Sequence, residues 1–401
     1  MGERERGFLQ KGSLAQTPPY INKTKKGNKI MKFNLGKPQK SNERLFKKDM
    51  KSPRCFAKCK RDKDGFTYID VNNSPFVLGG LIKPEDNGNE YYRLDVTRKE
   101  EYSGANRSLA NHTAGGCIRF STDASVISIR VNNRFSSTGM SHFCNRGVWG
   151  IDCYVGTGTA REYVGKMMQT FATDPNYNEG TIDLPAGIKE VQINLPLYGG
   201  IEKMVIGFPK GAHIGAPTKR SVKPVAFYGS SITQGGCVSR PANSYANIIC
   251  RALDADCVNY GFSGSAMGEL VVAEHIASRE LSCFVMDYDY NSPSCESLEA
   301  THEPFFKCIR EKQPDLPVVF VTHPFYAKAT ENDKKRIAIV KKTYENALSN
   351  GDKNVYFVDS SAFFTEEMRD LYSVDNLHPN DLGQFSMAET IYPVVKKAVG
   401  K

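Results

Sequence analysis

The chain has 401 residues, 40% of them hydrophobic and 10% aromatic, which is enough for more than one hydrophobic core and favours at least two domains. It contains no run of about eighteen apolar residues, the length that a membrane-spanning helix requires, so we expect no membrane partner. Eleven cysteines scattered over this length are unlike the dense framework of a small secreted domain, so we expect reduced thiols.

Residues 1–64 carry most of the positive charge. They hold 19 Lys and Arg against 6 Asp and Glu, a net charge of +13, whereas the rest of the chain has a net charge of −4. A basic segment rich in Asn, Lys and Ser with little periodic apolar content is typical of a disordered tail. We therefore predict such a tail and no nucleic-acid partner. The first thirty residues lack an apolar core of signal-peptide length, so we expect a cytoplasmic protein.

Residues 65–217 are predicted to form a β-sandwich, jelly-roll-like domain. Short β-branched segments with period-two patterning are separated by Gly, Asn, Asp and Pro, as in all-β domains. No helix of ordinary length is predicted here. The expected strands cover residues 91–96, 125–131, 151–155, 181–184, 190–195 and 203–207.

Residues 218–401 have a different pattern and are predicted to form an α/β domain. Apolar strands of four to six residues alternate with helical stretches, as in a parallel sheet covered on both faces. The third helix is expected to open at Thr301 with Pro304 in its first turn. The expected strands cover residues 224–228, 257–260, 283–287, 317–322 and 355–358. The expected helices cover residues 244–253, 268–279, 301–311, 331–348 and 380–399.

The loop Gly229-Ser-Ser-Ile-Thr-Gln-Gly-Gly236 follows the first of these strands, at the edge where open parallel sheets bind their ligands. A phosphate-binding loop would need Lys and then Ser or Thr after its second glycine, but Gly236 and Cys237 follow Gly235. The dinucleotide spacing G-x-G-x-x-G is absent, and Thr233 replaces the second glycine of the nucleophile elbow G-x-S-x-G. A different arrangement around a nucleophilic serine remains open.

Other loops carry candidate partners for such a serine. Asp375 and His378 lie three residues apart before the last helix, so the carboxylate can hold an imidazole that takes a proton from a serine hydroxyl. Gly264 and the Asn291 amide follow other strands and could donate hydrogen bonds to an oxyanion. Considered singly, the same residues could be a helix cap with a surface histidine, a turn glycine and a loop-capping asparagine.

Taken together, these residues resemble the SGNH (GDSL-type) hydrolases over residues 222–401. Gly229-Ser-Ser-Ile-Thr233 looks like the block that carries the nucleophile. The resemblance implies a flavodoxin-like three-layer α/β/α fold, a serine esterase that works through an acyl-enzyme, and no metal or organic cofactor. It implies a catalytic set of Ser231, Asp375 and His378, with an oxyanion hole made by the Ser231 amide, Gly264 and Asn291.

The preceding domain also carries a resemblance. Gly150-Ile-Asp-Cys-Tyr154 is similar to the Gly-x-Asp-Leu-Tyr signature of the β-sandwich that precedes a subset of these enzymes. Two positions depart from the family pattern. Ser230 stands where Asp usually lies beside the nucleophile, and Asn291 lacks the common Gly-x-Asn-Asp surroundings.

Members of this two-domain type include bacterial carbohydrate esterases that remove acetyl groups, which implies a small acylated substrate such as an acetylated oligosaccharide. Arg240, Tyr290 and His323 are candidates to contact it. They could instead be a surface ion pair, a core aromatic residue and a structural histidine. The alternative functions are a lipid or aryl-ester hydrolase that uses the same residues, and a carbohydrate-binding protein with a vestigial serine site.

Two short patterns offer partial metal sites. Cys55-x3-Cys59 and His142-x-Cys144 each supply two of the four ligands that structural zinc needs. Neither has a convincing second half nearby in the sequence, and short motif matches often arise by chance. We therefore predict no metal site.

Overall fold

The computed structural model describes residues 64–135, 140–167, 176–324 and 329–401. All of them belong to one contact unit, which spans Asn34–Lys401. The predicted basic tail, apart from Asp64, and the Cys55–Cys59 pair lie outside the described residues. No helix in the described ranges is both long enough and apolar enough to cross a membrane.

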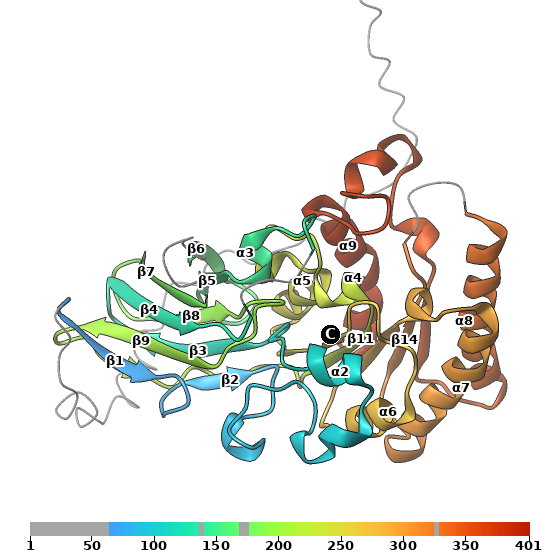
Figure 1. The fold of residues 1–401 in the computed structure, drawn as a ribbon, viewed down its shortest axis with the longest axis horizontal. Helices are drawn as coiled ribbons and strands as arrows, with labels where there is room; N and C mark the ends of the chain where they lie inside the picture. The colour runs from blue at the N-terminus through green and yellow to red at the C-terminus, as the bar shows by residue number, and fades with distance from the viewer. Residues whose placement is uncertain (1–63, 136–139, 168–175, 325–328) are drawn as a thin grey trace, which may run out of the picture. The chain divides into compact units, whose positions relative to one another are not determined.

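The first part of the described chain forms two antiparallel sheets around a shared core, which confirms the predicted β-sandwich (Figure 1). One sheet has the strand order β1-β9-β4-β7, and the other has the order β10-β3-β8-β5-β6 with β2 paired to β3. Ile129 and Ile206 of the first sheet pack in one cluster with Phe120 and Ile193 of the second. The strands are Phe66–Asp70 (β1), Val77–Gly79 (β2), Cys117–Thr122 (β3), Val126–Asn132 (β4), Ile151–Val155 (β5), Glu162–Met167 (β6), Tyr177–Asp183 (β7), Lys189–Asn194 (β8), Lys203–Pro209 (β9) and Ile214–Gly215 (β10).

Five of the six strands predicted here overlap β4, β5, β7, β8 and β9, but the strand predicted over residues 91–96 is wrong. The Asn87 side-chain amide donates to the carbonyl oxygens of Tyr92 (3.2 Å) and Leu94 (3.0 Å). These carbonyls therefore have a side-chain partner in place of a neighbouring strand. Helices in this part are short: Pro84–Asp86 (η1), Val96–Glu101 (η2), Gly104–Leu109 (α2) and Asn145–Val148 (α3).

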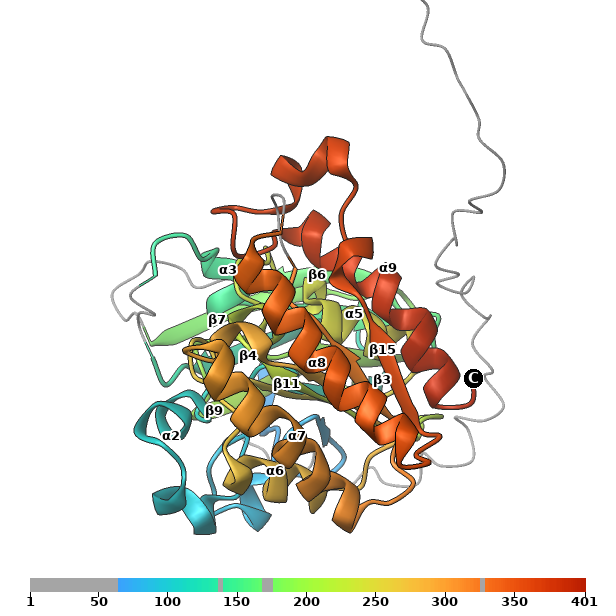
Figure 2. The same ribbon diagram turned by 90° about the vertical axis from the view of Figure 1, so that its right-hand side faces the viewer.

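The second part forms a parallel sheet with helices on both faces, as predicted for a three-layer α/β/α domain (Figure 2). The strand order is β12-β11-β13-β14-β15. Alternate strand residues face opposite layers: Tyr228 stacks on Phe305 of α7 (Cys295–Lys312), whereas the neighbouring Phe227 contacts Tyr245 of α5 (Tyr245–Leu253). The strands are Val225–Gly229 (β11), Cys257–Gly261 (β12), Cys283–Asp287 (β13), Val318–Val321 (β14) and Val355–Val358 (β15).

Two groups of helices cover this sheet. α5 packs against α9, while α6, α7 and α8 pack against one another in succession. The predicted start of the third helix at Thr301 is wrong, because Ser294 caps α7 by accepting the Ser297 amide and Pro304 lies inside the helix. The helices are Ser231–Gln234 (α4), Tyr245–Leu253 (α5), Leu270–Ala277 (α6), Cys295–Lys312 (α7), Glu331–Ser349 (α8) and Asp381–Ala398 (α9).

The change from antiparallel to parallel sheet falls between β10 and β11. The domain limits of residues 65–217 and 218–401 remain predictions from the sequence.

Candidate active site

Strand register places three of the predicted site residues at one edge of the sheet. Gly229 at the end of β11 lies opposite Gly261 of β12 on one side and Asp287 of β13 on the other. All three strands are parallel, so the loops that follow them leave the same edge of the sheet. Ser231, Gly264 and Asn291 lie two, three and four residues beyond those strand ends, respectively.

The loop that carries Ser231 turns sharply from strand to helix. A side chain at Gly229 would place its Cβ 2.1 Å from the Asp287 carbonyl oxygen, so this turn requires glycine. Ser230 then caps α4, because its hydroxyl accepts the Ile232 amide at 3.1 Å. Ser230 thus has a local structural role at the position where the family usually has Asp. Ser231 is the first helical residue, so its own N–H has no acceptor within the helix.

Ser231, His378 and Asp375 form one hydrogen-bonded series. The Ser231 Oγ lies 2.9 Å from His378 Nε2, and His378 Nδ1 lies 2.7 Å from Asp375 Oδ2. A carboxylate can only accept, so the imidazole proton sits on Nδ1 and Nε2 is left to accept the serine proton. Burial raises the pKa of Asp375, but the amide and ring N–H groups of His378 and the Leu377 amide outweigh it and hold that pKa below its usual value.

Asn291 and Gly264 lie on loops that contact each other. The Asn291 Nδ2 donates to the Phe262 carbonyl oxygen at 3.0 Å, and the Phe262 amide donates to the Gly229 carbonyl oxygen at 2.8 Å. Gly264, two residues beyond Phe262, has a φ of +67°, which favours glycine. These bonds tie the loops after β12 and β13 to the end of β11.

His323 is enclosed and holds the Asn291 loop in place. It is 2% exposed, its Nδ1 lies 2.8 Å from Asp289 Oδ2, and its Nε2 lies 3.2 Å from Asp333 Oδ1. Burial lowers the pKa of His323, but the two carboxylates outweigh it and raise that pKa above its usual value. Arg336 supports the same loop by donating to the Asp289 carbonyl oxygen at 2.6 Å. Both ring nitrogens of His323 therefore face carboxylates of the chain.

Tyr290 presents an open aromatic surface beside this histidine. The residue is 42% exposed, and its ring lies 4.8 Å from the His323 ring, between centroids. Burial contributes most to raising the pKa of Tyr290, and the negative charges of Asp333, Asp289 and Asp375 add to the rise. Tyr290 is therefore partly exposed on the loop that carries Asn291.

Arg240 contacts the Gly-x-Asp-Leu-Tyr-like motif. Its Nη1 donates to Asp152 Oδ2 at 3.2 Å and to the Tyr154 hydroxyl at 2.6 Å. Asp152 is fully buried, and it also accepts the Ala242 amide at 2.9 Å and the Asn194 side-chain amide at 2.7 Å. The motif thus fastens the loop that follows the nucleophile, and these bonds occupy Arg240 with the sandwich.

The sandwich also reaches the serine site through residues that the sequence did not single out. The Phe143 ring lies 5.7 Å from the His378 ring, between centroids, and the Tyr198 hydroxyl donates to the Ser231 carbonyl oxygen at 3.4 Å. The Gln234 side chain donates to His112 Nδ1 at 2.7 Å and accepts the amide of Ser263, next to Gly264, at 3.1 Å. No local signal marks these contacts, because they join segments far apart in the chain.

A buried carboxyl group lies beneath the serine loop. Asp287 accepts hydrogen bonds from the Thr233 hydroxyl at 3.0 Å and from the Tyr245 hydroxyl at 2.8 Å. Burial, with a smaller contribution from the charge of Asp289, raises the pKa of Asp287 to about 8. These hydrogen bonds tie the end of β13 to Thr233 of the serine loop and to α5.

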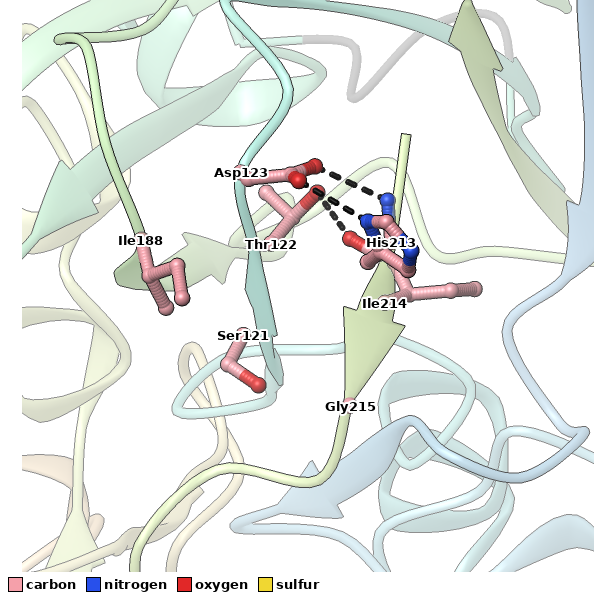
Figure 3. A pocket seen from close by; sticks show the side chains of 7 residues that line it. All are labelled: Ser121, Thr122, Asp123, Ile188, His213, Ile214 and Gly215. Carbon is pink, nitrogen blue, oxygen red and sulfur yellow. Dashed lines mark hydrogen bonds and ion pairs between the residues drawn. The ribbon is translucent and has the colours of Figure 1, made fainter. Parts of the chain in front are cut away.

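The hollow in Figure 3 lies on the sandwich, where Asp123 and His213 also pair. His213 Nδ1 lies 2.9 Å from Asp123 Oδ2, and the His213 amide donates to Asp123 Oδ1 at 2.8 Å. The Thr122 hydroxyl donates to the His213 carbonyl oxygen at 2.7 Å. These contacts fasten β10 to β3. The hollow is lined by Ser121, Thr122, Asp123, Ile188, His213, Ile214 and Gly215.

Residues with metal-binding side chains also meet at the serine site. Within the described ranges, His142, Cys237 and His378 bring ligand atoms within 4.8 Å of one another. Cys144, which the sequence pairs with His142, is not part of this group.

Two family models match successive parts of the chain. Residues 222–396 match the GDSL-like lipase/acylhydrolase family, and residues 66–214 match the family described as the N-terminus of SGNH-hydrolase-type esterases. A search of curated protein sequences gives no match.

Solved structures with the same fold include three informative neighbours. A protein described as a GDSL-like lipase from Bacteroides ovatus is 25% identical, with a TM-score of 0.74 over 84% of this chain and 98% of its own. The salicylyl-acyltransferase SsfX3 of a tetracycline biosynthetic pathway is 18% identical, with a TM-score of 0.70 over 85% of this chain and 99% of its own. A family two carbohydrate esterase from Clostridium thermocellum, solved with cellohexaose, is 15% identical, with a TM-score of 0.53 over 72% of this chain and 93% of its own.

Proposed function

The chain is an SGNH (GDSL-type) hydrolase with an N-terminal GxDLY domain, and from this premise we propose that it is a serine esterase that works through an acyl-enzyme. The observation that carries the proposal is the hydrogen-bonded series from Ser231 through His378 to Asp375. Such a series supplies a nucleophile, a base and a group that orients the base.

In the first half-reaction, the Ser231 Oγ attacks the ester carbonyl carbon while His378 Nε2 accepts the hydroxyl proton. The carboxylate of Asp375 stabilises the imidazolium that forms. His378 then protonates the leaving alcohol, and the acyl group stays on Ser231. Water attacks this acyl-enzyme with His378 again as the base, which releases the carboxylic acid and restores the serine.

The anion of the tetrahedral intermediate is assigned to the Ser231 and Gly264 amides and to Asn291. The Asn291 amide nitrogen carries two hydrogens, and one of them is used by the Phe262 carbonyl oxygen. The other is available to the oxyanion. Removing one such donor typically lowers kcat by about 10²- to 10³-fold.

For the substrate, we favour O-acetyl groups on oligosaccharides. The partly exposed Tyr290, on the loop that carries Asn291, offers a ring face on which a sugar ring can pack. A neighbour of the same fold is a carbohydrate esterase solved with cellohexaose, which supports the same class of ligand. Arg240 and His323, both held by carboxylates, are assigned structural roles. A cytoplasmic location remains a prediction from the sequence.

The test is acetate release from acetylated xylo- and manno-oligosaccharides, compared with hydrolysis of long-chain aryl esters. We expect faster turnover of the acetylated sugars. Faster turnover of long-chain esters would favour a lipid or aryl-ester hydrolase, and binding of oligosaccharides without turnover would favour a vestigial site. Because one neighbour of the same fold is a salicylyl-acyltransferase, an alcohol acceptor is added in a parallel assay to measure whether the acyl-enzyme also transfers its acyl group.

Ser231→Ala should abolish turnover of every ester. Ser230→Ala is the matched control, because it removes a hydroxyl from the adjacent residue. That hydroxyl caps α4 and faces the Ile232 amide, so the control should keep measurable acetate release.

A further inference from the structure

Three potential metal ligands from distant parts of the chain meet beside the nucleophile. His142 precedes α3 in the sandwich, Cys237 follows α4, and His378 is the base proposed above. Their ligand atoms all lie within 4.8 Å of one another. The His142 and His378 rings lie 5.0 Å apart, between centroids.

The two loops that carry His142 and Cys237 pack side by side. The Cys237 thiol lies 3.6 Å from the His142 carbonyl oxygen, and the Cys144 thiol lies 3.8 Å from the Ser239 carbonyl oxygen. Gly147 permits this approach, because a Cβ at that position would lie 2.3 Å from the Val238 carbonyl oxygen. The position of Cys237 next to His142 is therefore set by backbone packing.

A carboxylate is already placed to support both imidazoles. Asp375 Oδ2 lies 2.7 Å from His378 Nδ1 and 3.9 Å from His142 Nε2. Metal-ligating histidines usually donate their other ring N–H to such a carboxylate, which fixes the tautomer. With Nδ1 of His378 engaged in this way, its Nε2 lone pair is the one that can bind a metal.

Two imidazoles and a thiolate suit Zn²⁺ and related soft or borderline ions better than Mg²⁺ or Ca²⁺. Tetrahedral zinc, with bonds of about 2.0 to 2.3 Å, places its ligand atoms roughly 3.3 to 3.8 Å apart. The cluster would need to contract by about 1 Å to reach that spacing. The His142 side chain is 35% exposed and can supply the movement, and water can take the fourth position.

We propose that His142, Cys237 and His378 form an inhibitory site for Zn²⁺-type ions. Binding forms a metal–sulfur bond and releases the thiol proton of Cys237 to solvent, with no change of oxidation state. The ion occupies the Nε2 lone pair that the Ser231 proton needs, so ester hydrolysis stops while the metal is bound. The inhibitory effect rests on the proposed esterase function, whereas metal binding does not.

Two measurements on the full-length protein test this site. In the first, ester hydrolysis is titrated with Zn²⁺ in the wild type, Cys237→Ser, His142→Ala and the control Cys144→Ser. Cys237→Ser and His142→Ala should each raise the zinc concentration for half-inhibition by at least about tenfold, because even changes to residues that only support the metal ligands weaken metal affinity by about 10- to 100-fold. Cys144→Ser, two residues from His142 but outside the cluster, should leave zinc sensitivity as in the wild type.

The second measurement uses Co²⁺, whose thiolate charge-transfer absorption reports a cobalt–sulfur bond without any need for activity. Wild type and Cys144→Ser should show this band, and Cys237→Ser should lose it. A cobalt band in a protein whose metal-free form has no esterase activity would overturn the proposed function and leave the metal site standing. Active enzyme that gives no band and loses no activity in zinc would overturn the metal site alone. Equal zinc sensitivity in Cys237→Ser and wild type would also overturn it.

Discussion

Asp152→Ala should weaken both the fold and the serine site, although Asp152 belongs to the sandwich and does not contact Ser231 in the interactions described above. Its carboxylate is fully buried and accepts hydrogen bonds from Arg240, the Ala242 amide and the Asn194 side chain. The alanine variant leaves the Ala242 N–H and the charge of Arg240 without this acceptor.

The magnitude follows from the loss of one partner of a buried ion pair, which typically costs about 3 to 5 kcal/mol. We place Asp152→Ala at the lower end, about 3 kcal/mol, because Arg240 keeps its hydrogen bond to the Tyr154 hydroxyl. Asp152→Asn retains the shape of the side chain and should cost less. The loop after the nucleophile should also lose its anchor, so kcat should fall more than KM rises.

The assay combines urea unfolding with steady-state hydrolysis of a short-chain aryl acetate. Asp183→Ala, on the exposed end of β7, is the control and should change the free energy of unfolding by less than about 0.5 kcal/mol. If Asp152→Ala behaves like this control in both measurements, the reasoning that the motif anchors the catalytic loop is refuted.

Three further predictions concern the site itself. In Gly264→Ala, the new Cβ would have no heavy atom within 4 Å, so the variant should be destabilised only by the backbone strain of a φ of +67°. Urea unfolding should show a free energy of unfolding lower by roughly 1 to 2 kcal/mol. The kcat should also fall, because the strain shifts the Gly264 amide. The pKa of Asp287 is about 8 in the folded protein and about 3.8 in the unfolded chain, so the free energy of unfolding should fall as pH rises between these values. Asp287→Asn should flatten that slope. Urea midpoints measured from pH 5 to 8 that show the same slope in the variant and the wild type would contradict this prediction. Tyr290→Ala should raise KM for acetylated oligosaccharides by about fivefold, the equivalent of roughly 1 kcal/mol of ring packing, and an equal rise for aryl acetates would argue against a sugar platform.

The sequence pattern alone predicted the strands that consist of uninterrupted apolar runs. The strands over residues 283–287 and 355–358 match β13 and β15 because buried parallel strands are short, continuous and apolar. Strand ends could then be placed at one sheet edge, which is why Ser231, Gly264 and Asn291 could be grouped before their contacts were known.

Prediction failed where side chains, and not a neighbouring strand, make the hydrogen bonds of the backbone. Residues 91–96 are rich in buried aromatic and aliphatic residues and look like a strand, but the Asn87 amide binds their carbonyl oxygens. The contacts of Phe143, Tyr198 and His142 with the serine site could not be predicted either. They depend on how the sandwich packs on the parallel-sheet domain, and no spacing within the sequence encodes that packing.

The central claim is that Ser231 is an activated nucleophile served by His378. The most direct measurement is labelling with a fluorophosphonate, followed by mass spectrometry of the intact protein and of the modified peptide. We predict one label per chain on Ser231, none on Ser231→Ala, and much slower labelling of His378→Ala. A folded protein that takes no label, or takes it at another residue with Ser231 unmodified, would contradict the account.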